Sequence, residues 1–198
     1  MILGMDTSGK YLNLALIDND KTTDYIHEEC FKHQSERILP EIDNLLKRNN
    51  LSHDDIEAFV LTRGPGSYTG VRIAMTLAKV WASVKKLPVY TVSSLQLYAG
   101  NKEMTAVYLD ARAHRGYTGF YNLGYAVEED SVYTEEDFRE FTADKPDWEV
   151  ISDTEEFGNN ITEDICLNFL KLKKYWEKVE NVDALVPVYL KDALEYKV

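Results

Sequence analysis

The chain contains few of the residues on which disulfide-rich and metal-binding proteins depend. Among its 198 residues are two cysteines, Cys30 and Cys166, too few for the disulfide framework of a small secreted domain. Its four histidines are scattered, and none stands four residues from another as in the HExxH and HxxxH zinc motifs. We therefore predict no bound metal, and the spacing argues against a metalloprotease.

The chain also lacks a long hydrophobic run. No apolar stretch approaches the roughly 20 residues of a membrane-spanning helix, and the short apolar N-terminus has neither the basic residues nor the length of a secretory signal. Hydrophobic residues still make up 44% of the sequence, which is enough to bury a sizeable core. We therefore expect a folded cytoplasmic protein that makes no membrane contact.

Positive charge is scarce, and the shortage lies in the second half. The net charge is −12, from 22 basic and 34 acidic side chains. Residues 1–100 hold 11 basic and 12 acidic side chains, whereas residues 101–198 hold 11 and 22. Residues 128–164 alone contain 15 acids against Arg139 and Lys145. Nucleic-acid binding depends on clustered Lys and Arg, so the composition disfavours an autonomous RNA- or DNA-binding protein.

Hydrophobic periodicity predicts an α/β fold. Alternating and fully apolar segments indicate three strands joined by short turns, followed by helices and strands in alternation. This order is typical of a ribonuclease-H-like domain. The expected strands are 2–6, 11–18, 23–29, 58–62 and 88–92, and the expected helices are 34–48, 71–86 and 93–100.

After residue 100 the pattern starts again, which predicts a second lobe. Strands are expected at 104–110 and 116–124, an acidic irregular stretch with one weak strand at 125–160, a helix at 161–175 and a last strand at 186–190 before a short terminal helix. We predict a first lobe at 1–100 and a smaller acidic lobe at 101–198. The last segment, about 183–198, is expected to pack back on the first lobe.

A glycine-rich loop, residues 63–70, joins a predicted buried strand to a helix. Helix N-termini favour anions, but the loop lacks the Lys-Ser/Thr of a Walker A motif and does not match G-x-G-x-x-G. Ser67 directly follows a glycine, so it does not match the G-x-S-x-G elbow of hydrolases either. The pattern favours a structural turn in which Gly64, Gly66 and Gly70 adopt backbone angles that other residues avoid.

A second candidate for phosphate binding is Asp6-Thr7-Ser8, at the end of the first predicted strand. In actin-like phosphotransferases, an aspartate followed by small hydroxyl residues at this point holds a metal–phosphate group. Asp-Thr-Ser is also an ordinary turn sequence. Asp110 stands at the corresponding point of the second half and hints at a duplicated lobe. The segment Asp6, Thr7 and Ser8 is therefore a candidate phosphate site with an ordinary turn as the alternative, and the family resemblance described below implies that the site is degenerate and that the chain has no catalytic residue.

The predicted helix 71–86 is apolar around most of its circumference. A helix that packs only on a sheet needs a single apolar face, whereas this one carries one stripe of large residues and a second stripe of alanines. We therefore expect it to be covered twice. The second cover is either the predicted helix 34–48 or another chain.

Several motifs together resemble the bacterial TsaB family, also called YeaZ. They are Gly4-Met-Asp-Thr-Ser8, His33-Gln-Ser-Glu-Arg-Ile-Leu-Pro40, Arg63-Gly-Pro-Gly-Ser-Tyr-Thr-Gly-Val-Arg-Ile73, Pro88-Val-Tyr-Thr-Val-Ser-Ser-Leu95, Leu109-Asp-Ala-Arg112 and Pro187-Val-Tyr-Leu-Lys191. The third is the most specific. The likeness covers residues 1–123 closely and returns only in the last dozen or so, so residues 125–182 depart from the pattern and the second lobe is short.

The resemblance implies an actin/Hsp70-like (ASKHA) fold of two ribonuclease-H-like lobes, the second shortened. It also implies a non-catalytic paralogue of TsaD, the catalytic subunit in threonylcarbamoyladenosine synthesis beside the anticodon of ANN-reading tRNAs. The implied partners are TsaD in a heterodimer, TsaE in a ternary complex, and a second copy of this chain through the same helices. tRNA is reached only through the complex. No cofactor is intrinsic, and ATP or ADP is expected only at the interface with the partner complex.

The partner-docking surface is expected on the two helices of the first lobe. On this view, Ala78→Arg or Ala82→Glu abolishes pairing and leaves the fold intact. One alternative is an ASKHA-type ATPase or small-molecule kinase that uses Asp6, Thr7 and Asp110, and another, less favoured, is a glycoprotease-like peptidase. The predicted interface residues are Ile38, Leu39, Ile42, Leu45, Leu46, Arg72, Met75, Thr76, Ala78, Lys79 and Ala82.

Overall fold

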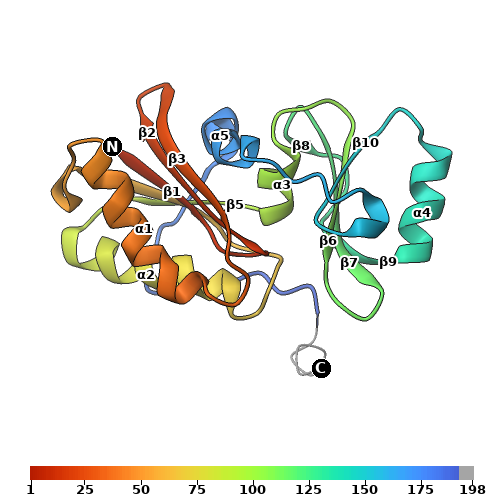
Figure 1. Cartoon of the computed structure of the whole chain (residues 1–198), viewed down its shortest axis with the longest axis horizontal. Helices are drawn as coiled ribbons and strands as arrows, with labels where there is room; N and C mark the ends of the chain where they lie inside the picture. The colour runs from red at the N-terminus through yellow and green to blue at the C-terminus, as the bar shows by residue number, and fades with distance from the viewer. Residues whose placement is uncertain (192–198) are drawn as a thin grey trace.

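Three antiparallel strands open the chain and begin the first of two sheets. The computed structural model describes residues 1–191, and in them the sheets lie side by side with helices packed on their faces (Figure 1). The expected mixed α/β architecture is confirmed. The first sheet has the order β11-β5-β4-β1-β2-β3. Its strands are β1 (Ile2–Asp6), β2 (Tyr11–Asp18), β3 (Lys21–Glu29), β4 (Ala58–Thr62), β5 (Val89–Val92) and β11 (Glu177–Lys178).

The centre of this sheet is buried on both faces, which explains its nearly continuous apolar strands. β1 pairs antiparallel with β2 and parallel with β4, and β4 pairs parallel with β5. Two helices, α1 (Gln34–Arg48) and α2 (Gly70–Lys85), cover one face and bury the side chains of Leu3 and Met5. Parallel β1, β4 and β5 therefore end at one edge, where ligands bind in many open α/β sheets.

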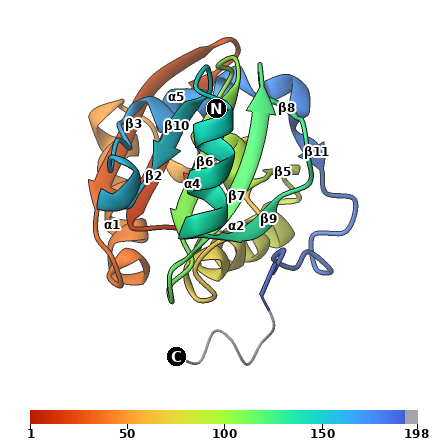
Figure 2. The same cartoon turned by 90° about the vertical axis from the view of Figure 1, so that its right-hand side faces the viewer.

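The second sheet has the order β10-β6-β7-β8, with β9 also paired to β7. Its strands are β6 (Thr105–Asp110), β7 (Arg115–Asn122), β8 (Tyr125–Ala126), β9 (Ser131–Thr134) and β10 (Glu149–Ser152). Helix α4 (Glu135–Asp144) lies across β6 and β7 (Figure 2). Aromatic side chains, among them Phe120 and Phe138, fill the space between helix and sheet.

Helix α4 corrects the expectation that residues 125–160 are irregular. Thr134 begins it with a capping box, in which its hydroxyl accepts from the Asp137 N–H while the Asp137 carboxylate contacts the Thr134 N–H. Phe138 and Phe141 then face the sheet. The helix start signal is present in the sequence, but the high density of acidic residues obscures it.

The two sheets share a core. Side chains of β2 and β4 and of the second sheet's β6 and β7 belong to one buried cluster, which also includes α3 (Ser94–Ala99) and α5 (Asp164–Lys171). α5 packs on β2 and β3, on the opposite face from α1 and α2. A helix expected in the second lobe thus covers the first sheet, because the chain returns there after β10. The lobe boundary near residue 100 stays a prediction.

Residues 177–191, here called the strap, run back along the first sheet. β11 extends the edge of the sheet by pairing with β5, and farther along the Val188 N–H donates to the Arg63 carbonyl (2.7 Å). The strand expected at 186–190 is wrong, since these residues form no ladder. The short terminal helix and residues 192–198 of the predicted returning segment lie outside the described residues. Within residues 1–191 no helix is long and apolar enough to cross a membrane.

Candidate functional site

Helix α2 is the element for which the sequence predicts a second cover. The small side chains of Ala74, Ala78 and Ala82 are buried, which lets the helix backbone lie close to the sheet. On the outer surface, Val80 and Val84 are 62% and 77% exposed, and Leu39 of the neighbouring α1 is 53% exposed. Large apolar side chains are therefore left in solvent on the two helices that the resemblance associates with docking.

Much of the predicted interface lies inside this chain's own core. Among the eleven residues, Leu39, Arg72 and Thr76 are exposed and Lys79 is partly exposed. The burial of Ala78 and Ala82, which have almost no exposed surface, argues against the expectation that Ala78→Arg and Ala82→Glu spare the fold. The interface itself stays a prediction, but its buried members cannot present a surface. They are Ile38, Ile42, Leu45, Leu46, Met75, Ala78 and Ala82.

The strap covers one flank of α2, between its buried alanines and its exposed valines. Lys79 Nζ donates to the carbonyls of Asp183 (2.7 Å) and Leu185 (3.1 Å). Ser83 Oγ donates to the Asp183 carboxylate (3.1 Å). Part of the second cover is thus internal, and it comes from the strap as well as from α1, which packs against α2.

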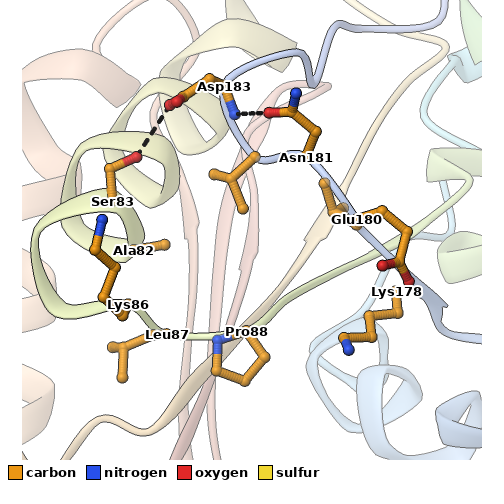
Figure 3. Close-up of a pocket in the computed structure, with 11 residues that line it drawn as sticks. Ala82, Ser83, Lys86, Leu87, Pro88, Lys178, Glu180, Asn181 and Asp183 are labelled. Atoms are coloured by element: carbon orange, nitrogen blue, oxygen red, sulfur yellow. Dashed lines mark hydrogen bonds between the residues drawn. The ribbon is translucent and has the colours of Figure 1, made fainter.

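Between the end of α2 and the strap lies an open groove of about 610 Å³ (Figure 3). Lys86 and Lys178 line it together with Glu180 and Asp183, so its charged side chains balance. The groove contains none of the predicted phosphate-binding residues.

The glycine-rich loop packs tightly against the first turn of the chain. A Cβ atom on Gly66 would lie 2.5 Å from the Ser8 carbonyl oxygen, and one on Gly70 would lie 2.3 Å from that of Thr7. Gly64 has a φ of +101°, a backbone angle that residues other than glycine avoid. The sequence predicts unusual backbone angles at all three glycines. For Gly66 and Gly70 the structure gives a different reason, which is close backbone contact.

Thr7 and Ser8 are held by this contact. The Ser67 N–H donates to the Ser8 carbonyl (2.8 Å). The Thr7 hydroxyl donates to the Gly70 carbonyl (2.7 Å) and accepts from the Ala74 N–H (3.2 Å). The Thr7 hydroxyl is therefore already hydrogen-bonded to the first turns of α2, and a helix N-terminus is a place where anions bind.

Asp6 is fully buried, and its carboxylate is satisfied by protein groups. Oδ1 accepts from the Ser8 N–H (3.0 Å) and from the Thr62 hydroxyl (2.6 Å), and Oδ2 accepts from Asn13 (2.9 Å). These donors come from β2, β4 and the β1–β2 turn. In this geometry the Asp6 carboxylate serves the fold, whereas the buried Ser8 hydroxyl has no hydrogen-bond partner within the described residues. The phosphate role predicted for Asp6, Thr7 and Ser8 stays a prediction. Across residues 1–191, no three His, Cys, Asp or Glu side chains are grouped as a metal site.

Asp110 ends β6 as expected, but its side chain is exposed, unlike that of Asp6, and it has different hydrogen-bond partners. Its carboxylate accepts from the Arg112 N–H (2.7 Å), and its own N–H donates to Asp153 (2.8 Å). Asp6 and Asp110 thus occupy comparable strand ends in different environments. The pair lacks the matched, accessible carboxylates that a phosphotransferase site needs.

A polar contact that the sequence does not predict joins the second sheet to the N-terminus of α3. The Asp130 carboxylate accepts hydrogen bonds from Ser93 and Tyr121. Burial raises the pKa of the Asp130 carboxyl, and these two hydrogen bonds and the charge of Arg63 oppose that rise. Nothing in the sequence distinguishes Asp130 from the other acids of residues 128–164.

Known proteins resemble the chain over the regions just described. The family model for TsaD, the tRNA N6-adenosine threonylcarbamoyltransferase, matches residues 26–143. The TsaB protein of Bacillus subtilis, named for tRNA threonylcarbamoyladenosine biosynthesis, is 37% identical over 124 residues, which are 61% of this chain and 54% of that protein. Its counterpart in Escherichia coli is 39% identical over 98 residues, which are 50% of this chain and 42% of that protein. The chain thus spans about half the length of the curated relatives it matches.

Two further similarities extend along nearly the whole chain. An uncharacterized protein of Mycoplasma pneumoniae is 26% identical over 197 residues, which are 96% of this chain and 94% of that protein. A crystal structure of a Pseudomonas aeruginosa protein with similarity to the peptidase YeaZ has a TM-score of 0.76 and 26% identity, and the match covers 96% of this chain and 99% of that one. Residues 125–182, which depart from the motif pattern, therefore still share the fold.

Proposed function

The chain belongs to the TsaB/YeaZ family, and on this basis we propose that it is a non-catalytic accessory subunit in the synthesis of threonylcarbamoyladenosine on tRNA. The observation that carries the proposal is the apolar surface of α1 and α2, where Leu39, Val80 and Val84 are exposed. Such side chains on neighbouring helices favour a protein partner. We place the chain in the cytoplasm, with tRNA as the substrate of the whole complex.

The proposed partner is the TsaD-type catalytic subunit, which docks on α1 and α2. Val80 and Val84 stand four residues apart, so they lie one above the other on the same face of α2. A partner helix can pack its apolar face against them. The exposed Arg72 and Thr76 belong to the polar rim of this surface. A second copy of the chain competes for the same surface, and the TsaE-type ATPase joins the heterodimer.

The burial of Asp6 and Thr7 supports the proposal that the chain is non-catalytic. A phosphotransferase of the ASKHA type needs this part of its cleft open to metal and phosphate, whereas here both side chains are buried and hydrogen-bonded. We therefore propose a two-lobed ASKHA fold that has kept its architecture without its nucleotide site. ATP or ADP is then bound only where the partner supplies the remaining contacts.

Co-purification with the TsaD protein of the same organism tests the proposal. We expect a heterodimer in size-exclusion chromatography with light scattering, and threonylcarbamoyladenosine formation that requires both chains. Calorimetry of the isolated chain with ATP and magnesium is the parallel measurement. Micromolar ATP binding by the chain alone, without pairing, would instead favour the kinase or ATPase alternative.

A further inference from the structure

Four exposed lysines stand within eight residues at the end of α5 and in the segment that follows. They are Lys171, Lys173, Lys174 and Lys178, here called the lysine ridge. Lys173 pairs with Asp20 (3.1 Å). Elsewhere many basic side chains are matched with acids, as Arg37, Arg48 and Lys102 are. This is a local concentration of positive charge in a protein whose net charge is −12.

Within the described chain, Lys171, Lys174 and Lys178 have no carboxylate within ion-pair distance. Lys174 Nζ lies over the ring of Tyr175, 4.7 Å from its centroid, and no salt bridge involves the other two. Glu177, the acid within the ridge, is bound by Arg63 with 2.6 Å between Nη1 and Oε2. Lys171 and Lys174 therefore present ammonium groups without a paired acid, whereas Lys178 lines the groove beside α2 together with Glu180 and Asp183.

The backbone that carries the ridge is fixed. The Trp176 indole N–H donates to the Phe169 carbonyl (3.0 Å), and the Tyr175 hydroxyl donates to that of Leu123 (2.9 Å). Beyond them, β11 pairs with β5. Because the backbone is already ordered, a ligand that binds the lysines has only side-chain freedom to restrict.

Lys171 and Lys174 lie away from the proposed docking helices. α5 packs on one face of the first sheet, and α1 and α2 pack on the other (Figure 1). The Cβ position of Gly4, in the middle of the sheet, points at the ring of Phe169 in α5. A partner on α1 and α2 therefore leaves Lys171 and Lys174 in solvent, whereas Lys178 lines the groove at the end of α2.

We propose that Lys171 and Lys174 bind the phosphate backbone of the tRNA substrate in the assembled complex. This inference rests on the proposed function, which supplies the RNA. The bulk charge of −12 does not oppose it, because salt screens exposed charges beyond a Debye length of about 8 Å at physiological ionic strength. Asp164, at the other end of α5, lies about 10 Å from Lys171 along the helix.

The proposal refines the conclusion drawn from composition. Counted over the chain, basic side chains are too few for autonomous binding of nucleic acid, and the ridge does not change that count. It adds a small number of contacts to those of a partner. Such contacts orient a nucleic acid without reading its sequence.

The test compares two double variants in complex with the catalytic partner. Lys171→Gln/Lys174→Gln removes two ridge charges, and Lys32→Gln/Lys145→Gln removes two exposed charges that lie elsewhere and, like Lys174, over aromatic rings. The probe is an unmodified transcript of an ANN-reading tRNA. Binding is measured from 50 to 200 mM salt.

We expect the ridge variant to lower the slope of log affinity against log salt by about 2, roughly 1 for each lysine that no longer neutralises a phosphate. Affinity at 0.1 M salt should fall about tenfold or more, and the control variant should match wild type. Equal slopes for ridge variant and wild type would overturn the proposal. A second result would also overturn it: the ridge variant binds tRNA as wild type does, but anionic phosphatidylserine vesicles bind wild type and do not bind the variant.

The outcome is separable from that of the proposed function. Pairing with the catalytic subunit is measured first, by size-exclusion chromatography without RNA. Failure of wild type to pair refutes the proposed function. Normal pairing with an unchanged salt slope refutes only the lysine ridge.

Discussion

Thr62 Oγ1 lies 2.6 Å from Asp6 Oδ1 and donates a hydrogen bond to this fully buried carboxylate. The side chain of Asn13 approaches the other carboxylate oxygen from the opposite strand. Asp6 thus ties β1 to both of its neighbours at the edge where the parallel strands end. Its carboxylate oxygens are turned inward and form part of the core.

Replacing Thr62 by valine should destabilise the protein. The change keeps the side-chain shape and removes one donor from a buried carboxylate, and hydrogen bonds to charged groups contribute about 1.5–3 kcal/mol. We expect the free energy of unfolding in urea to fall by about that amount. Thr76→Val, at an exposed position of α2, should change it by less than about 0.5 kcal/mol. Equal stabilities for the two variants would show that the Thr62 hydrogen bond contributes nothing.

Replacing Gly66 by alanine should also destabilise the fold. The new Cβ atom would lie 2.5 Å from the Ser8 carbonyl oxygen, a backbone atom that moves only with β1 and its turn. Overpacking of this kind costs about 1–3 kcal/mol, which lowers the melting temperature by roughly 2–12 °C in a chain of this size.

Thr69→Ala is the matched control for Gly66→Ala, because Thr69 is exposed and its side chain makes no capping hydrogen bond to α2. Its melting temperature should stay close to that of wild type. A Gly66→Ala protein that melts with wild type would show that the loop can move away from Ser8.

The exposed valines of α2 give a test of the docking surface that spares the fold. Val80→Arg places a charge on a residue that is 62% exposed. We expect pairing with the catalytic subunit to be lost while the free energy of unfolding changes by less than about 0.5 kcal/mol. Chromatography of the mixed chains measures the first, and urea denaturation measures the second.

Ala78→Arg provides the contrast. Ala78 is fully buried, so arginine there overpacks the α2–sheet contact and buries a charge without a partner. The variant should lose several kcal/mol of stability, in the exceptional range for a point mutation. A folded Ala78→Arg protein, or a Val80→Arg protein that pairs normally, would contradict this placement of the surface.

Local periodicity in the sequence is enough to predict much of the first sheet and its helices. The meander of β1, β2 and β3, the helices α1 and α2, and the strands β4 and β5 all lie where the sequence predicts them. Periodicity also indicates that α2 has two apolar stripes. It cannot indicate which stripe meets the sheet, so it assigns Ala78 and Ala82 to the surface although they are buried.

The remaining differences come from long-range contacts. α5 packs on β2 and β3, more than a hundred residues earlier in the chain, and no pattern within residues 161–175 specifies that sheet. Asp130 lies in an acidic run and meets Ser93 only because β9 pairs with β7. After the short strand β11, the strap is held on the first lobe by apolar contacts of Val182 and Leu185 and by isolated hydrogen bonds, such as that from Lys79 to Asp183, which leave no periodic signal.

Asp130 predicts a pH dependence that can be measured against a neutral replacement. Burial raises the pKa of its carboxyl, against the opposing hydrogen bonds from Ser93 and Tyr121. When the pKa of an acid is higher in the folded state, the folded state binds the proton more tightly. The stability gained from this proton is full below the unfolded pKa of about 3.9, and it is lost as the pH rises through the higher folded pKa.

The asparagine introduced by Asp130→Asn cannot ionise, so the variant undergoes no such loss. Its free energy of unfolding, relative to wild type, should therefore increase from pH 4 to pH 7 and become constant above the folded pKa of the wild-type carboxyl. Urea denaturation at each pH measures this difference. Asp147→Asn, at an exposed position, controls for the loss of one negative charge and should give a nearly flat difference. An Asp130→Asn difference that is equally flat would mean that this carboxyl titrates alike in the folded and unfolded chains, and that the contact with Ser93 and Tyr121 fully offsets the effect of burial.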